Sequence, residues 1–332
     1  MKNVHDPIDR RLLDDWQRNF PICPRPFQII AKDLDISEDD VLSRLTRMNQ
    51  SGRITRVGGT CAPNTLSAST LAAVAAPEVD LEKVAQIIND EPGVNHSYER
   101  EDHWNLWFVA TGPDRAHVDA TLARISERSG LRVLDLRLVR PFNVDLGFRM
   151  SGVSNPISSS EQTPLELDSI QAGDHEIMNA LTQGLPIVPT PYAEVARDLG
   201  LSEDDVLSRI TALQKARVLS RLGVIVRHRA LGWTSNAMVV WNVSASRVVE
   251  AGTALASLPG VTLCYERTPV DDVWPYRLYS MIHAKSRPDA MAVLERAKAL
   301  EPLVGCEHKA LFSTRCFRQN GAMITRRKGA VA

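Results

Sequence analysis

The apolar positions of this chain follow a helical period in some stretches and a period of two in others. Ser37, a good N-cap residue, begins a stretch with apolar residues at helical spacing, and Gly52 ends it. Two shorter helical patterns precede Ser37, and an alternating stretch follows Gly52. The predicted elements are helices at 9–18, at 26–34 and after Ser37, with a strand at 53–57. Three helices and a wing are typical of a winged helix-turn-helix module.

After this module the pattern alternates between strands and helices. The first half predicts strands at 70–76, 94–100, 105–111 and 132–139, with helices at 81–89 and 116–129. The second half predicts strands at 236–243, 261–267, 276–283 and 304–312, with helices at 246–258 and 288–300. This β-α-β-β-α-β order is ferredoxin-like, with both helices on one face of an antiparallel sheet. We expect the second copy to cover the other face.

The two halves are copies of one another. Residues 9–59 align with 174–224 without a gap, and Tyr98-Glu99-Arg100 returns as Tyr265-Glu266-Arg267. A repeat this long indicates a duplicated domain rather than a solenoid. The expected fold class is therefore α+β, a tandem duplication of a winged helix-turn-helix plus a ferredoxin-like domain. The expected boundaries are 1–62, 63–150, a flexible Ser- and Pro-rich linker at 151–168, then 169–230 and 231–332.

Composition and charge exclude several classes of protein. The 332 residues are 44% hydrophobic and carry a formal net charge of -1, so we expect no strong attraction to nucleic acid or to a membrane surface. No stretch approaches the ~20 apolar residues of a spanning helix, and the N-terminus lacks an apolar signal region. The five cysteines lack CxxC spacing, so no metal site is expected. A cytoplasmic protein is the resulting prediction.

A helix-turn-helix followed by a ferredoxin-like domain resembles the Lrp/AsnC family of bacterial regulators. Six segments resemble a narrower branch, the sirohaem decarboxylases, as two fused subunits: 96–100, 105–108, 221–232, 236–241, 264–267 and 274–283. This resemblance implies that acetate side chains of sirohaem lose carbon dioxide, giving 12,18-didecarboxysirohaem in haem d1 biosynthesis. It implies no added cofactor, since the iron belongs to the substrate. It also implies a second, similar subunit pair of the same pathway as a partner.

The third helix of each module argues against tight DNA binding. Both copies begin with Glu-Asp-Asp, at 38–40 and 203–205, and these carboxylates would repel phosphate. The alternative is that they serve only the helix dipole and cap. We expect the modules to act as a scaffold or dimer brace. The competing hypothesis is a ligand-responsive regulator of the Lrp/AsnC type.

Polar side chains share strand faces where a tetrapyrrole site requires cations and a proton donor. By alternation His96, Tyr98 and Arg100 point one way, as do Tyr265 and Arg267. Arginine suits carboxylates, and imidazole suits proton delivery near neutral pH. The alternative for such a face is an ordinary hydrogen-bonded sheet surface.

Together with the resemblance, these patterns predict one asymmetric pocket between the ferredoxin-like domains. Arg100 and Arg267 would anchor carboxylates, while Tyr98 and Tyr265 would pack against or hydrogen-bond the substrate. The remaining substrate-binding candidates are Arg227, Arg229, Trp274 and Tyr276. His228 and His283 would be acid catalysts, and His96 a partner or an iron ligand. These three histidines align with Pro63, Thr111 and Leu263 of the other half, which is why one pocket is expected.

Overall fold

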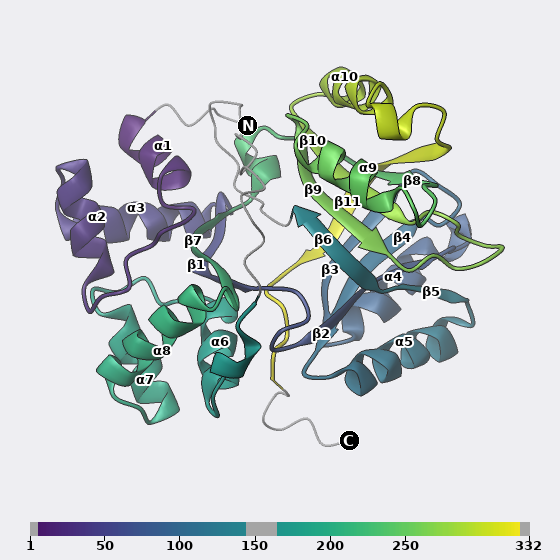
Figure 1. Cartoon of the computed structure of the whole chain (residues 1–332). Helices are drawn as coiled ribbons and strands as arrows, with labels where there is room; N and C mark the ends of the chain where they lie inside the picture. The colour runs from purple at the N-terminus through teal and green to yellow at the C-terminus, as the bar shows by residue number, and fades with distance from the viewer. Residues whose placement is uncertain (1–5, 144–164, 326–332) are drawn as a thin grey trace.

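The computed structural model describes residues 6–143 and 165–325, so most of the expected linker lies outside the described residues. Two helix-turn-helix modules form one side of the molecule, and two ferredoxin-like domains form the other (Figure 1). This arrangement confirms the expected α+β class and the duplication. None of the described helices is long and apolar enough to cross a membrane.

The helices of the modules begin where local capping signals place them. The first module contains α1 (Pro7–Asp14), α2 (Pro26–Leu34) and α3 (Glu38–Gln50), and the second α6 (Asp174–Gln183), α7 (Pro191–Leu199) and α8 (Glu203–Lys215). The Asp40 N–H donates to Ser37 Oγ, and the Asp205 N–H donates to Ser202 Oγ. The acidic residues after each serine therefore lie in a capped first turn, where they stabilise the helix dipole.

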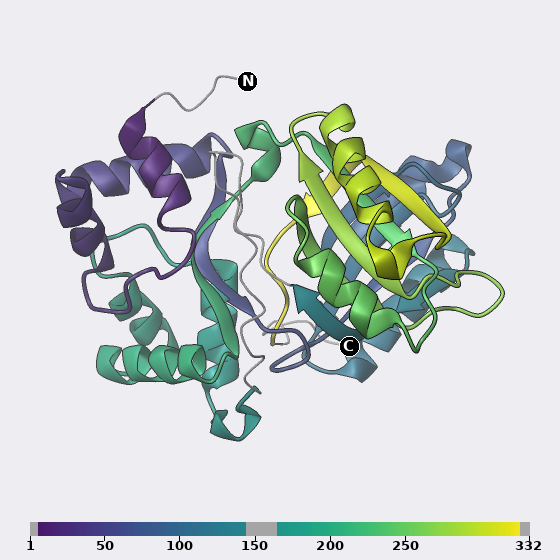
Figure 2. The same cartoon turned by 45° about the horizontal axis from the view of Figure 1, so that its top comes forward.

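The two modules are joined through their wings. Strand β1 (Ile54–Cys61) pairs antiparallel with β7 (Leu219–Val226), and Figures 1 and 2 show the two strands side by side between the helices. The apolar residues of both modules form one shared core. Gly223 on β7 allows the segment after α1 to pack closely against this strand, because a Cβ at this position would lie 2.3 Å from the backbone of Gln17. This pairing supports the predicted role of the modules as a brace.

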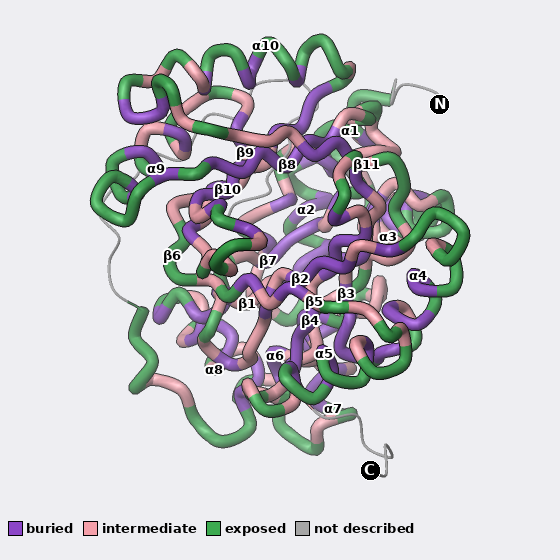
Figure 3. Tube along the Cα trace, turned by 90° about the vertical axis from the view of Figure 1, so that its right-hand side faces the viewer, coloured by how far each residue is buried: buried purple, intermediate pink, exposed green. Residues whose placement is uncertain are grey.

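Each ferredoxin-like domain packs its helices on the outer face of its sheet. The first contains β2 (Ala68–Val74), α4 (Leu81–Asp90), β3 (Val94–Arg100), β4 (Leu106–Gly112), α5 (Arg115–Ser129) and β5 (Val133–Leu136), followed by β6 (Leu138–Asn143). The second contains β8 (Ser235–Trp241), α9 (Val248–Ala256), β9 (Val261–Arg267), β10 (Leu278–Ala284), α10 (Arg287–Lys298) and β11 (His308–Gln319). Figure 3 shows buried residues along the strands and a largely exposed α10.

The last strand of each half crosses to the other half. Residues 308–312 of β11 pair with β8 of their own sheet, whereas 313–319 pair with β3. The first half does the same in two pieces: β5 pairs with β2, and β6 pairs with β9. The order is therefore β5-β2-β4-β3-β11-β8-β10-β9-β6. The prediction of one strand at 132–139 was wrong, because the chain changes partner after Leu136.

The centre of the space between the two sheets is filled by large apolar side chains. Trp107 and Trp274 face each other there with ring centroids 5.3 Å apart. The other buried members are Ala73, Trp104, Leu134, Leu136, Met238, Val240, Tyr276, Tyr279 and Leu311. The sheets therefore face each other as expected, and the centre of the interface in which one pocket is predicted is filled.

Trp274 and Tyr276 belong to this packing. Trp274 is 1% exposed and donates its indole N–H to Tyr279 Oη, and Tyr276 is 3% exposed and donates its hydroxyl to Glu307. Their polar atoms therefore have partners and their rings have no exposed face. Both residues therefore have a packing role in this cluster, and their predicted place among the substrate contacts stays a prediction.

Replacing Trp274 with alanine should lower the free energy of unfolding by about 3–5 kcal/mol, because it leaves a large cavity between the sheets. Chemical denaturation followed by circular dichroism measures this. Val304→Ala is the control, since Val304 is 64% exposed, and should change stability by less than about 0.5 kcal/mol. A Trp274→Ala protein with wild-type stability and weakened ligand binding would contradict the packing assignment.

Candidate active site

Arg100 is a buried cation for which the structure describes no anion. It ends β3, is 5% exposed, and donates from Nη1 to Leu311 O at 3.0 Å and to Asn236 Oδ1 at 3.1 Å. Its Nε has no hydrogen-bond partner among the described residues. Burial lowers the pKa of Arg100 to about 10, which still leaves it charged at neutral pH. Because a buried unpaired charge is costly, this guanidinium is suited to a carboxylate brought by a ligand.

Arg267 repeats this arrangement at the equivalent position of the second half. Its Nη1 donates to Leu136 O at 2.9 Å, so each arginine reaches the last strand of the opposite half. Its Nε also has no hydrogen-bond partner among the described residues, and burial lowers its pKa. The guanidinium lies over the rings of Tyr265 and Tyr279, with centroid distances of 5.3 and 5.8 Å. Both arginines predicted as anchors therefore donate to a backbone carbonyl of the opposite half, whereas the bond to Asn236 is described for Arg100 alone.

The tyrosines beside these arginines stay protonated. Burial raises the pKa of Tyr98, and it raises the pKa of Tyr265 to about 12. Arg100 lies over the ring of Tyr98 at 5.5 Å, and His96 Nδ1 is 3.2 Å from Tyr98 Oη. Both phenols can therefore donate or accept hydrogen bonds at neutral pH. The structure brings His96, Tyr98 and Arg100 onto one face of β3, as alternation predicted.

His283 lies at the same end of the interface as Arg100. It pairs in register with Asn236 across β10 and β8, and it is 4% exposed. Its Nε2 is 2.6 Å from Asn236 Nδ2, and its Nδ1 is 2.7 Å from Thr262 Oγ1. Since Asn236 also binds Arg100, the histidine and the arginine are linked through one amide. Sequence reasoning missed Asn236 and Thr262, because neither stands beside His283 in the chain.

The basic segment after the second wing approaches the same end. The short helix η3 (His228–Leu231) contains Arg229, which donates to Ser313 O and Oγ at 3.0 and 3.1 Å. Burial raises the pKa of Tyr98, whereas the positive charges of Arg100 and Arg229 lower it. Both cations therefore lie near this phenol. Arg227 is exposed, and its backbone N–H donates to Arg53 O. The side chain of His228 lies outside what the structure describes.

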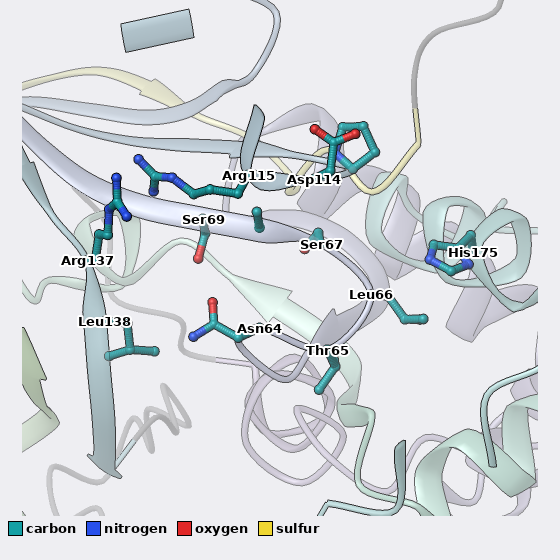
Figure 4. Close-up of a pocket in the computed structure, with 12 residues that line it drawn as sticks. Asn64, Thr65, Leu66, Ser67, Ser69, Asp114, Arg115, Arg137, Leu138 and His175 are labelled. Carbon is teal, nitrogen blue, oxygen red and sulfur yellow. The ribbon is translucent and has the colours of Figure 1, made fainter. Parts of the chain in front are cut away.

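The opposite end of the interface contains an open cavity of about 380 Å³ (Figure 4). Its lining includes Ser69 and His175, and Ser69 pairs in register with Thr111 as Asn236 does with His283. Figure 4 also shows Arg115 and Arg137 at this cavity, but both form ion pairs with Asp135. The cavity therefore lacks both the strand histidine and the unpaired cation of the other end. Within the described ranges, no group of three His, Cys, Asp or Glu could hold a metal ion.

Comparisons with known proteins agree with this geometry. The chain matches the AsnC-like ligand binding domain at 66–142 and 230–318, and the Siroheme decarboxylase NirDL-like HTH domain at 9–54 and 174–219. It is 52% identical over 320 residues to the siroheme decarboxylase NirDL subunit of Paracoccus pantotrophus, covering 96% of this chain and 98% of that one. The chain belongs to the siroheme decarboxylase NirDL family. The resemblance to the sirohaem decarboxylases that the sequence predicted is confirmed.

Other members of this family extend the comparison. The crystal structure of a siroheme decarboxylase NirDL superposes with a TM-score of 0.68 at 26% identity, covering 95% of this chain and 93% of that one. The same kind of protein in co-complex with an iron-uroporphyrin III analogue gives 0.66, with 92% of that chain covered. The siroheme decarboxylase NirG subunit of Pseudomonas aeruginosa is 40% identical over 144 residues, 43% of this chain and 98% of that subunit. The family therefore includes single-copy subunits and fused pairs.

Arg100→Met should leave the free energy of unfolding within about 1 kcal/mol of wild type, because it removes a buried charge together with its hydrogen bonds. Arg44→Met is the matched control, since Arg44 is paired with Asp6, Asp9 and Asp40 and should lose about 1–3 kcal/mol. Denaturant titration of both variants measures the difference. An Arg100 variant as unstable as the Arg44 variant would mean that Arg100 serves the fold rather than a ligand.

Proposed function

We propose that this protein is a sirohaem decarboxylase, which removes acetate carboxyls of sirohaem to give 12,18-didecarboxysirohaem in haem d1 biosynthesis. The observation that carries the proposal is the pair of arginines, Arg100 and Arg267, whose charges lack a carboxylate partner among the described residues. A tetrapyrrole with many carboxylates supplies the missing anions. The relative solved with an iron-uroporphyrin III analogue supports this class of ligand.

The reaction sets out what the protein must do. The bond between the acetate methylene and its carboxyl carbon breaks, and carbon dioxide leaves. The electron pair stays on the methylene carbon and spreads into the macrocycle, and one proton then forms the methyl group. An arginine bound to the departing carboxylate would stabilise the ground state and slow this step. Arg100 and Arg267 therefore hold carboxylates that remain on the ring, and they orient the reacting acetate.

The remaining candidates take roles around these anchors. His283 and His228 act as acids that supply the proton, and His96 is a partner of Tyr98 or an iron ligand. Tyr98 and Tyr265 pack against the macrocycle or donate to it, and Arg227 and Arg229 reach its outer carboxylates. No cofactor is proposed beyond the iron that sirohaem itself carries. Trp274 and Tyr276 stay candidate contacts of the substrate.

Two broader expectations accompany this function. The similarity to the NirG subunit supports a second, similar decarboxylase pair as a partner in the same pathway. The cytoplasmic location and the absence of tight DNA binding stay predictions from the sequence. Anaerobic incubation of the purified protein with sirohaem, followed by mass spectrometry, tests the function. A product lacking one or two carbon dioxide units is expected, and an unchanged mass would contradict the proposal.

His283→Ala should retain sirohaem binding and stop carbon dioxide release, because it removes the proton donor but neither anchor. The expected loss of turnover is about 10²–10⁴-fold, the usual contribution of a general acid. Arg267→Met is the contrasting variant and should weaken binding, seen as a raised KM, with a smaller effect on kcat. Optical titration and product mass spectrometry separate the two effects. Wild-type turnover in His283→Ala would remove His283 from the mechanism.

A further inference from the structure

A chain of hydrogen bonds runs from Arg100 into the sheet, and its donor directions are fixed at the Arg100 end. A guanidinium only donates, so the atom of Asn236 facing Arg100 must be its oxygen, at 3.1 Å. The amide nitrogen of Asn236 then faces His283 Nε2 at 2.6 Å. Because an amide nitrogen only donates, His283 Nε2 must accept, and it carries no proton in this state.

The other end of the chain agrees with this assignment. Thr262 Oγ1 donates to Met281 O at 3.1 Å, so its lone pair faces His283 Nδ1 at 2.7 Å. His283 Nδ1 must therefore be an N–H. Both ends give the same answer: without ligand, His283 is a neutral imidazole with its proton on Nδ1, the nitrogen that faces Thr262.

Protonating His283 would break this arrangement at Asn236. A proton on Nε2 faces the Asn236 amide N–H₂, so the amide must turn over and present its oxygen to the histidine. Its nitrogen then faces Arg100 Nη1, and two buried donors oppose each other. A ligand carboxylate beside Arg100 removes this conflict, because its oxygens accept from both the guanidinium and the turned amide.

We propose that Asn236 couples the binding of a substrate carboxylate at Arg100 to the uptake of one proton by His283. The coupling rests on the proposed function, for which His283 must hold a proton on Nε2. Asn236 is a positioning residue, since it acts through its two neighbours. By linkage, carboxylate binding and protonation of His283 favour each other equally.

The proton that His283 takes up on binding matches the proton that each decarboxylation consumes. Each acetate that becomes a methyl group consumes one proton, and the electron pair of the broken carbon–carbon bond forms the new carbon–hydrogen bond. His283 takes up that proton when the anchored carboxylate arrives and returns to its neutral form after giving it to carbon. While the carboxylate stays on Arg100, the histidine can take a proton again for a second acetate.

The elements around His283 carry charges of both signs, and the first half has no histidine at the equivalent strand position. The titratable groups on the elements that pair with or pack on β10 are Cys264, Tyr265, Glu266 and Arg267 on β9, Glu250 on α9, and Arg287, Asp289, Glu295, Arg296 and Lys298 on α10. Tyr279 lies on β10 itself, Lys285 follows it, and β3, η3 and β11 add Arg100, His96, Arg229 and Cys316. In the first half, Ser69 and Thr111 take the positions of Asn236 and His283. Neither titrates near neutral pH, so Arg267 has no equivalent proton partner.

Calorimetric binding of iron-uroporphyrin III in two buffers of different ionisation enthalpy counts the protons taken up. Wild-type protein should take up close to one proton per ligand above the usual histidine pKa of about 6.5. Its affinity should then weaken by up to about tenfold per pH unit, because the bound state holds more protons. Asn236→Leu should retain binding, with less than half of this uptake. Ser69→Ala, the equivalent position of the first half, should leave the proton count unchanged.

Nitrogen-15 spectra of the histidine side chains, assigned with His283→Gln, give a second readout that needs no Asn236 variant. The ligand-free protein should show His283 protonated on Nδ1 only. Proton uptake that persists in Asn236→Leu, or a ligand-free His283 protonated on Nε2, would overturn the coupling. A wild-type protein that decarboxylates sirohaem without proton uptake on binding would reject the coupling and keep the function. An unchanged sirohaem mass would reject the function itself.

Discussion

The strands of each ferredoxin-like domain have one face that the helices of that domain leave uncovered, and the strands of the sister domain cover it. The need to bury that face governs the rest of the structure. It brings the two sheets face to face, and it makes β6 and β11 pair across the halves. Any polar side chain on that face is then removed from water by the fold itself. Arg100 and Arg267 lie there, so their charges are buried as a consequence of how the halves associate.

The fusion allows the two ends of this interface to differ. A symmetric dimer would carry the same residues at both ends, whereas here His283 and Asn236 occupy one end and Thr111 and Ser69 the other. The backbone contacts of the two arginines remain alike, each donating to a carbonyl of the opposite half. Each end therefore has a buried arginine, and one end also has a titratable histidine on its strand. In the proposed function this difference would orient the substrate, because His283 lies at the end of the interface that contains Arg100.

The sequence predicts the bounds of elements that depend on local chemistry. It does not predict bounds that depend on pairing with strands distant in the chain. The bounds of α2, β3 and β9 agree to the residue, since caps and alternation are local signals. The break after Leu136 depends on which sheet each piece joins, and nothing near it in the chain records that. Alternation also identified the strand faces that carry polar residues. It did not show that the centre of the interface is filled, because a residue such as Trp274 can line a pocket or fill a core. The link from Arg100 to His283 runs across four strands, β3, β11, β8 and β10, so only coordinates show it.

Two buried cations also explain how such a site selects its ligand. A carboxylate that pairs with Arg100 recovers part of the energy lost by burying the guanidinium, and the same holds at Arg267. A ligand with a single carboxylate satisfies one arginine and leaves the other unpaired. In the proposed function, a ligand with several carboxylates supplies an anion to each arginine. Because unpaired buried charges penalise the smaller ligand, the two arginines favour a polycarboxylate macrocycle over a simple acid even where single contacts are equally strong.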